Sequence, residues 1–100
     1  MPQENTRFAE RTRIQLDAPE QFAVVFHNDD FTTMDFVMDV LINIFFKSQA
    51  DACALMLKVH EEGRGVAGVY PLDIARSKAT KALLMAREEG FPLKITLEKV

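Results

Sequence analysis

The segment from Met34 to Phe45 places the tightest constraint on the fold. Its apolar residues recur at the i, i+3, i+4, i+7 spacing of a helix, beside a polar stripe of Asp35, Asp39, Asn43 and Lys47. Phe36 and Val40 lie off the main apolar face, so this helix is apolar on more than one side. Such a helix needs two neighbours to cover it, which predicts a buried position between other elements.

A strand is predicted just before this helix. Residues 22–26 (FAVVF) are apolar and rich in β-forming side chains. They end at the turn-forming residues 28–30 (NDD). Thr32 and Asp35 have the spacing of a capping box, which predicts that Thr32 caps the helix.

A second helix is predicted to follow without a long linker. Ser48 and Asp51 repeat the capping-box spacing, and the helical pattern continues to about Glu62. Gly63 suits a left-handed stop. The short join predicts that the two helices form a helical hairpin.

The rest of the chain predicts a strand, a helix and a strand. Residues 65–70 fit a strand, and Pro71 and Asp73 suit the start of a third helix that Gly90 ends. Residues 93–97 alternate between apolar and polar side chains, as in a half-buried strand. The third helix presents a flat face of small residues suited to packing on a sheet, with Leu83 among Ala75, Ala79, Ala82 and Ala86.

The order strand, helix, helix, strand, helix, strand defines the predicted fold class. We expect an α/β fold of the α+β two-layer kind, with three helices on one face of a three-stranded, mostly antiparallel sheet. Apolar residues are sparse at the start of the chain, with six in residues 1–21 and 42 in residues 22–100. This division predicts a flexible N-terminal extension, residues 1–21, and one compact domain, residues 22–100. The extension is either a solvated leader or a segment used by a partner.

Charge and cysteine content exclude several classes. A net charge of -3 gives no electrostatic footprint for phosphate backbones, so we expect no nucleic-acid partner. No apolar run is long enough to suggest a membrane span, so no membrane partner is expected either. The single cysteine, Cys53, allows no internal disulfide, which fits a reducing cytoplasm. It lies within an apolar helical pattern and is interpreted as a buried small hydrophobe rather than a nucleophile.

Two helix faces predict a small apolar hollow. Met56, Val59 and His60 share one face of the second helix, and Met34 and Val37 are spaced to face the same space from the first. Asn28, Asp29 and His60 would supply polar groups at its mouth, the mixed design of many small-ligand sites.

The cluster from His27 to Asp30 has other interpretations. It is either a strand-ending turn stabilised by side-chain hydrogen bonds or a site for a metal or another cation. One rival hypothesis is a metal-dependent hydrolase that uses His27, Asp29, Asp30 and His60. A third is a scaffold domain of the same fold without a pocket.

Three motifs resemble those of the ClpS family, adaptors of the bacterial Clp protease. Residues 28–37 (NDDFTTMDFV) are similar to the family's NDDxTxM(E/D)FV motif. Residues 55–60 (LMLKVH), followed by Gly63, resemble its LMLxVH motif. Residues 91–93 (FPL) and 96–99 (TLEK) resemble its C-terminal strand. The resemblance covers residues 22–100, with the motifs in the family's order.

The resemblance implies an adaptor with no catalytic residue, metal or cofactor. Such adaptors bind N-degron proteins, through a free α-amino group and a first residue that is Phe, Tyr, Trp or Leu. They deliver them to the N-terminal domain of a ClpA-type AAA+ unfoldase, in the cytoplasm. The extension then corresponds to the family's delivery segment.

The resemblance also implies roles for individual residues. The positions that bind the α-amino group are Asn28, Asp29 and His60. Those that line or flank the hydrophobic pocket are Thr32, Met34, Val37, Met56, Val59 and Leu93, with Met34 as the gatekeeper against β-branched first residues. The unfoldase contacts are Asp73 and Lys78.

Two residues depart from the family pattern. Thr33 stands where many members have proline, which leaves the pocket positions intact. His27 stands where an apolar residue is common, and it introduces a second imidazole near the mouth.

Overall fold

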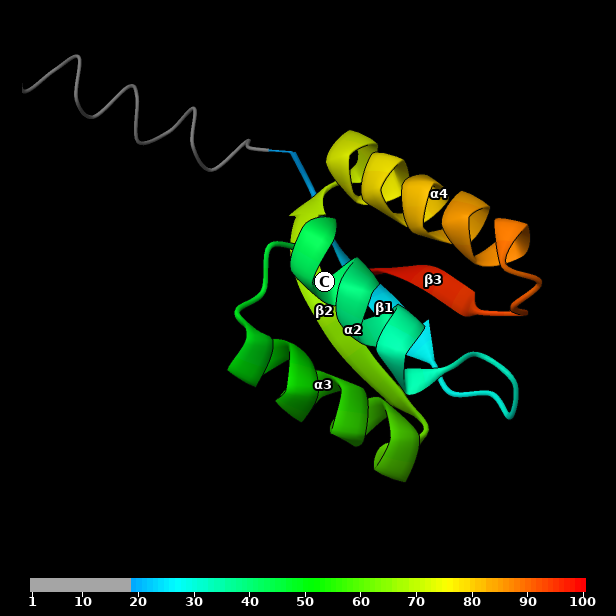
Figure 1. Cartoon of the computed structure of the whole chain (residues 1–100). Helices are drawn as coiled ribbons and strands as arrows, with labels where there is room; N and C mark the ends of the chain where they lie inside the picture. Colours follow the sequence, from blue (N-terminus) through cyan, green and yellow to red (C-terminus); the bar gives the residue numbers. More distant parts are fainter. Residues whose placement is uncertain (1–18) are drawn as a thin grey trace, which may run out of the picture.

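The computed structural model describes residues 19–100, and Figure 1 shows their arrangement. The elements follow one another as β1 (Gln21–His27), α2 (Met34–Asn43), α3 (Gln49–Glu62), β2 (Arg64–Pro71), α4 (Leu72–Glu88) and β3 (Lys94–Lys99). This is the predicted order. Residues 1–18 of the predicted extension lie outside the described residues, and Gln21 already belongs to β1.

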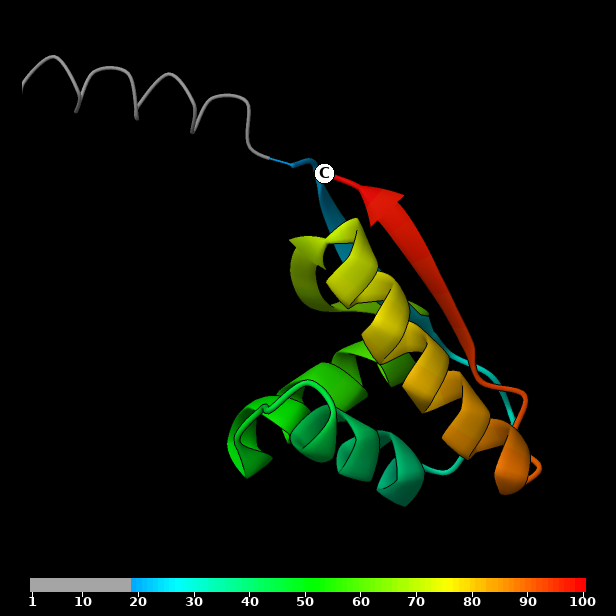
Figure 2. The same cartoon turned by 90° about the horizontal axis from the view of Figure 1, so that it is seen from above.

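The sheet has the order β2-β1-β3, and both pairings are antiparallel. The N-terminal strand is therefore central. One face of the sheet packs against the helices, which Figure 2 shows together on one side. The predicted two-layer α+β sandwich is confirmed.

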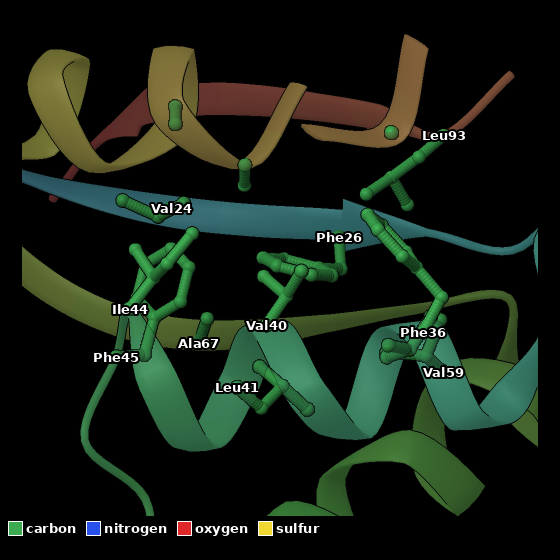
Figure 3. Close-up of a cluster of buried hydrophobic side chains, with 14 of the residues drawn as sticks. Val24, Phe26, Phe36, Val40, Leu41, Ile44, Phe45, Val59, Ala67 and Leu93 are labelled. Carbon is green, nitrogen blue, oxygen red and sulfur yellow. The ribbon is translucent and has the colours of Figure 1, made fainter. Parts of the chain in front are cut away.

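The core lies between this face of the sheet and the helices. Val24 and Phe26 of β1 point toward Val40 of α2, and all three are fully buried (Figure 3). The Phe26 and Phe45 rings meet edge to face at 5.5 Å, an arrangement that favours the packing beyond the area buried. Ala75, Ala79, Ala82 and Ala86 are the buried residues of α4, which lies across all three strands. The small-residue face therefore packs as predicted.

The double-sided burial of α2 is also confirmed. Phe36, Val37, Val40 and Leu41 are buried, while Asp35 and Asp39 are exposed. α3 packs against α2, and Phe36 and Val40 belong to the same core cluster as Val24 and Phe26 of the sheet, so the helix is covered from two sides. The helix ends at Asn43, so the last residues of the apolar pattern lie beyond it.

Two local predictions were wrong. The N-cap of α2 is Thr33, whose hydroxyl accepts a hydrogen bond from the Phe36 amide, whereas the Thr32 hydroxyl donates to Asp29. Cys53 is exposed rather than buried, because α3 buries only the face of Ala52 and Val59.

The ends of α3 match their sequence signals. The Ser48 hydroxyl accepts from the Asp51 amide, and Gly63 takes a left-handed φ of 90°. Gly63 also accepts a 2.9 Å bond from the backbone N–H of Asn28. This bond joins the end of β1 to the end of α3, and it brings the residues that follow β1 beside the last turn of α3.

Candidate functional site

A cavity of about 380 Å³ opens between the loop after β1, the first turns of α2 and the last turns of α3. The apolar members of its lining come from both helices and from the loop: Met34, Val37, Met56, Val59 and Phe31. Polar side chains border the same cavity, among them Asn28, Asp29, Thr32 and His60. The structure thus brings together every residue predicted for the amine site and the pocket except Leu93.

Leu93 does not line this cavity. It is 1% exposed and belongs to the core, where Figure 3 shows its side chain directed toward Phe36. Its carbonyl oxygen accepts a 3.0 Å bond from Arg87 Nη2. Leu93, which the resemblance assigns to the pocket, therefore contributes here to the hydrophobic core that supports α2.

The cavity has a floor of buried side chains, Val37 and Val59, and an exposed edge, or lip, at Met34. Val37 and Val59 are 8% and 5% exposed, so they belong to the core as well as to the cavity. Met34, at the start of α2, is 46% exposed. An unbranched thioether at the lip can adjust to different apolar shapes, whereas the two valines set a rigid floor.

Asp29 organises the loop with both carboxylate oxygens. Its Oδ1 accepts from the amides of Phe31 (2.8 Å) and Thr32 (2.7 Å), and its Oδ2 accepts from the Thr32 hydroxyl (2.7 Å). Burial alone would raise the pKa of this carboxyl. The hydrogen bonds from Thr32 and Phe31, with the charge of Arg87, outweigh burial and hold the pKa below its ordinary value. The carboxylate therefore stays ionised and keeps the loop closed on itself.

Asp30 is a cavity residue that the predicted set of amine-binding residues omitted. It borders the cavity, is exposed, and makes no side-chain hydrogen bond to another residue within 19–100. Its carboxylate can accept from a ligand, whereas Asp29 already accepts three hydrogen bonds within the loop, two at Oδ1 and one at Oδ2. The prediction named Asp29 and not Asp30, because nothing in an Asp-Asp pair shows which carboxylate closes the turn.

The mouth of the cavity suits a cation. The Asn28 amide oxygen, the Asp30 carboxylate and a neutral His60 ring can all accept hydrogen bonds. His60 also lies in the last turn of α3, where the partial negative charge of a helix C-terminus favours a cation by about 0.3–1 kcal/mol. A ligand with an ammonium group and an apolar side chain would satisfy both halves of the site.

His27 lies away from this mouth. Its Nε2 is 2.8 Å from Thr96 Oγ1 on β3, and Thr96 Oγ1 donates to Glu98 Oε2 at 3.3 Å. Arg64 Nη2 in turn donates a 2.6 Å hydrogen bond to Glu98 Oε1. Burial and the charges of Lys94 and Arg64 lower the pKa of His27, against an opposing effect of Glu98.

The metal-dependent hydrolase finds no support in this arrangement. His27 contacts the opposite strand rather than His60, and residues 19–100 contain no cluster of three His, Cys, Asp or Glu side chains able to hold a metal ion. The two residues for which the resemblance implies unfoldase contact lie on α4, where Asp73 is exposed and Lys78 is half-buried. No helix of this part of the chain has the length and apolar character needed to cross a membrane.

The fold and the cavity together define a small α+β domain with hydrogen-bond acceptors at the mouth of an apolar hollow. The family model for "ATP-dependent Clp protease adaptor protein ClpS" matches residues 17–96. The chain belongs to the ClpS family, and it is an adaptor of the Clp protease, not an enzyme.

Individual relatives agree with this assignment. The ClpS adapter of Oleidesulfovibrio alaskensis is 50% identical over 86 residues, which are 86% of this chain and 83% of the relative. That of Acetivibrio thermocellus is 46% identical over 95 residues, 95% of this chain and 96% of the relative. The solved structure of Agrobacterium tumefaciens ClpS2 bound to L-phenylalaninamide superimposes with a TM-score of 0.80 at 36% identity, covering 83% of this chain and all of that one.

Proposed function

We propose that this adaptor binds N-degron proteins through their free α-amino group and a first residue that is Phe, Tyr, Trp or Leu. The observation that carries the proposal is that one cavity is lined both by the polar residues Asn28, Asp30 and His60 and by the apolar residues Val37 and Val59. The bound ligand of the Agrobacterium relative has this chemistry, since phenylalaninamide offers a free α-amine beside an aromatic side chain.

The energetics of such a complex are reasonable. Hydrogen bonds to a charged donor contribute about 1.5–3 kcal/mol each, and burial of a Phe-sized side chain contributes about 1.5–3 kcal/mol more. Several such bonds and one buried side chain, less the cost of association, give about -8 kcal/mol, which corresponds to micromolar affinity.

Asp29 has two parts in this proposal. Its two oxygens accept three hydrogen bonds within the loop, which hold Phe31 and Thr32 in place. Its Oδ2 accepts only one of them and can also accept from the α-amine. Asn28, Asp29 and His60 therefore keep the amine-binding role, and Asp30 adds a second carboxylate at the mouth.

The test compares two peptides that differ only at the α-amine. A peptide with Phe first and a fluorophore at its far end is titrated with protein, with the amine either free or acetylated, and anisotropy is read. We expect the free peptide to bind and the acetylated one not to bind. Equal affinities would refute the proposal.

Delivery is the second half of the proposed function. We place the docking site for the N-terminal domain of a ClpA-type AAA+ unfoldase at Asp73 and Lys78 on α4, and we assign the handover in the cytoplasm to residues 1–21. ATP-dependent degradation of a Phe-first reporter by unfoldase and protease tests this. Removal of residues 1–18 should abolish degradation and leave peptide binding unchanged, whereas degradation at the full rate would exclude a delivery role for them.

A further inference from the structure

Phe31 is a large aromatic residue that borders the cavity and yet is 74% exposed. It is one of the most exposed apolar side chains in residues 19–100, although most of the aromatic residues there pack on the core. When a ligand covers an exposed aromatic ring, the burial of its apolar surface contributes favourably to the free energy of binding.

The backbone beneath Phe31 is held in place. Its amide donates a 2.8 Å bond to Asp29 Oδ1, and the next residue, Thr32, binds both oxygens of the same carboxylate. Thr33 then begins α2 as its N-cap. Because the loop is fixed at Asp29 and at the start of α2, the ring is presented to solvent from an ordered backbone. A ligand that uses it therefore has little loop-ordering entropy to overcome.

The path of a bound peptide leads to this ring. In the proposed complex, the α-amine lies among Asn28, Asp30 and His60 at the mouth, and the first side chain enters toward the apolar floor. The rest of the peptide must leave through the mouth. Consecutive Cα atoms lie only 3.8 Å apart, so the second residue is still at the rim, where the loop carries Phe31.

We infer that Phe31 forms a second subsite, which contacts the side chain of the second residue of an N-degron and favours apolar or aromatic residues there. This inference rests on the proposed binding function and names a preference that the first-residue cavity does not set. An aromatic side chain stacked on a partner of its own kind contributes enough for an affinity ratio of about three- to tenfold.

The experiment uses the full chain and labelled peptides with Phe first and either Gly, Leu or Trp second, each with a free amine. We expect Leu and Trp to bind about three- to tenfold more tightly than Gly. In Phe31→Ala this ratio should fall to about one. Phe31→Leu should retain preference for Leu and lose part of that for Trp.

Phe46→Ala is the matched control, because Phe46 is 79% exposed but does not line the cavity. It should keep the wild-type ratios. If wild type binds the three peptides equally, or if Phe31→Ala keeps the ratios, the subsite is refuted while the binding function stands. If none of the free-amine peptides binds, the proposed function fails and the subsite fails with it.

Discussion

The Lys78 ammonium donates a 2.7 Å hydrogen bond to the carbonyl oxygen of Ile44, the C-cap residue that follows α2. The same nitrogen lies over the rings of Phe45, Phe46 and Tyr70, at 4.6 Å from the Phe46 centroid. Lys78 therefore joins α4 to the end of α2, in addition to any contact with the unfoldase.

Replacement of Lys78 by alanine should destabilise the domain. It removes a charged hydrogen bond to a helix-end carbonyl and a cation–π contact, which together predict a loss of about 1–2 kcal/mol in the free energy of unfolding. Urea denaturation measures this, with Lys81→Ala on exposed α4 surface as the control. An unchanged midpoint would show that the contact carries no stability. Docking to the unfoldase is better tested with Asp73→Asn, since the side chain of Asp73 bonds only to the amide of Ile74.

Gly65→Ala should damage both stability and binding. A Cβ at this buried position would lie 2.9 Å from Val59 Cγ2 and 2.9 Å from Leu55 Cδ1, and Val59 lines the cavity. Overpacking of this kind predicts a loss of about 1–3 kcal/mol in stability, together with weaker peptide binding by anisotropy. Gly90→Ala is the control, because it strains a φ of 79° without meeting any atom. It should lower stability and preserve affinity, and equal affinity in both variants would contradict the prediction.

The pH dependence of stability should show two separate windows. The pKa of His27 is lowered from its ordinary 6.5, so the unfolded chain binds more protons and stability falls as pH drops below about 6.5. His27→Val should remove this decline between pH 7.5 and 5.5, as followed by thermal unfolding. The lowered pKa of Asp29 contributes stability above 3.8 that is lost at lower pH. The loss of stability below pH 3.8 should persist in His27→Val. If His27→Val still loses stability between pH 7.5 and 5.5 as the wild type does, His27 is not the source of that decline.

His60→Ala should weaken binding of a free-amine Phe peptide by about tenfold or more, the effect of one lost hydrogen bond to a charged donor. Anisotropy with the free-amine peptide checks this. An affinity unchanged from the wild type would show that His60 takes no hydrogen bond from the α-amine.

Met34→Ala should relax the choice of first residue. Met34 stands half-exposed at the lip, and its removal opens space beside the Cβ of a bound residue. The preference for Leu-first over Ile-first peptides should fall by about tenfold, the usual scale for one or two methylene contacts. Leu57→Ala, on the exposed face of α3, should leave the preference intact. An unchanged preference in Met34→Ala would show that the valine floor sets it.

Much of the fold follows from periodicity, because burial imposes it directly on the sequence. The double-sided pattern at Phe36 and Val40 predicted the central place of α2, and the glycine at 63 marked the end of α3 correctly. The cap of α2 was misassigned because Thr32 and Thr33 are both competent, and only the structure shows that Asp29 takes the first of them. Cys53 was misassigned because its small neighbours resemble a buried pattern, whereas α3 packs along a narrow stripe.

The site was predictable where its residues also serve the fold. Met56, Val59 and His60 follow helical spacing, so their common face could be read from sequence. Leu93 and Asp30 could not be placed in this way. An apolar residue in a strand pattern does not reveal whether it faces core or cavity, and a carboxylate in a turn does not reveal whether its oxygens are already bound.

The two ends of the central strand β1 lie beside different features of the molecule. The Val100 amide bonds to the Gln21 carbonyl, and Lys99 pairs with Glu20, so the C-terminus lies beside the point where residues 1–18 join (Figures 1 and 2). Asn28 and the cavity lie at the other end of the strand, about 20 Å away at ~3.3 Å per residue. Immobilisation through Val100 on a sensor surface would thus leave the peptide entrance open to solution, while a dye at Val100 would report on Glu20 and Gln21 and be insensitive to the bound peptide.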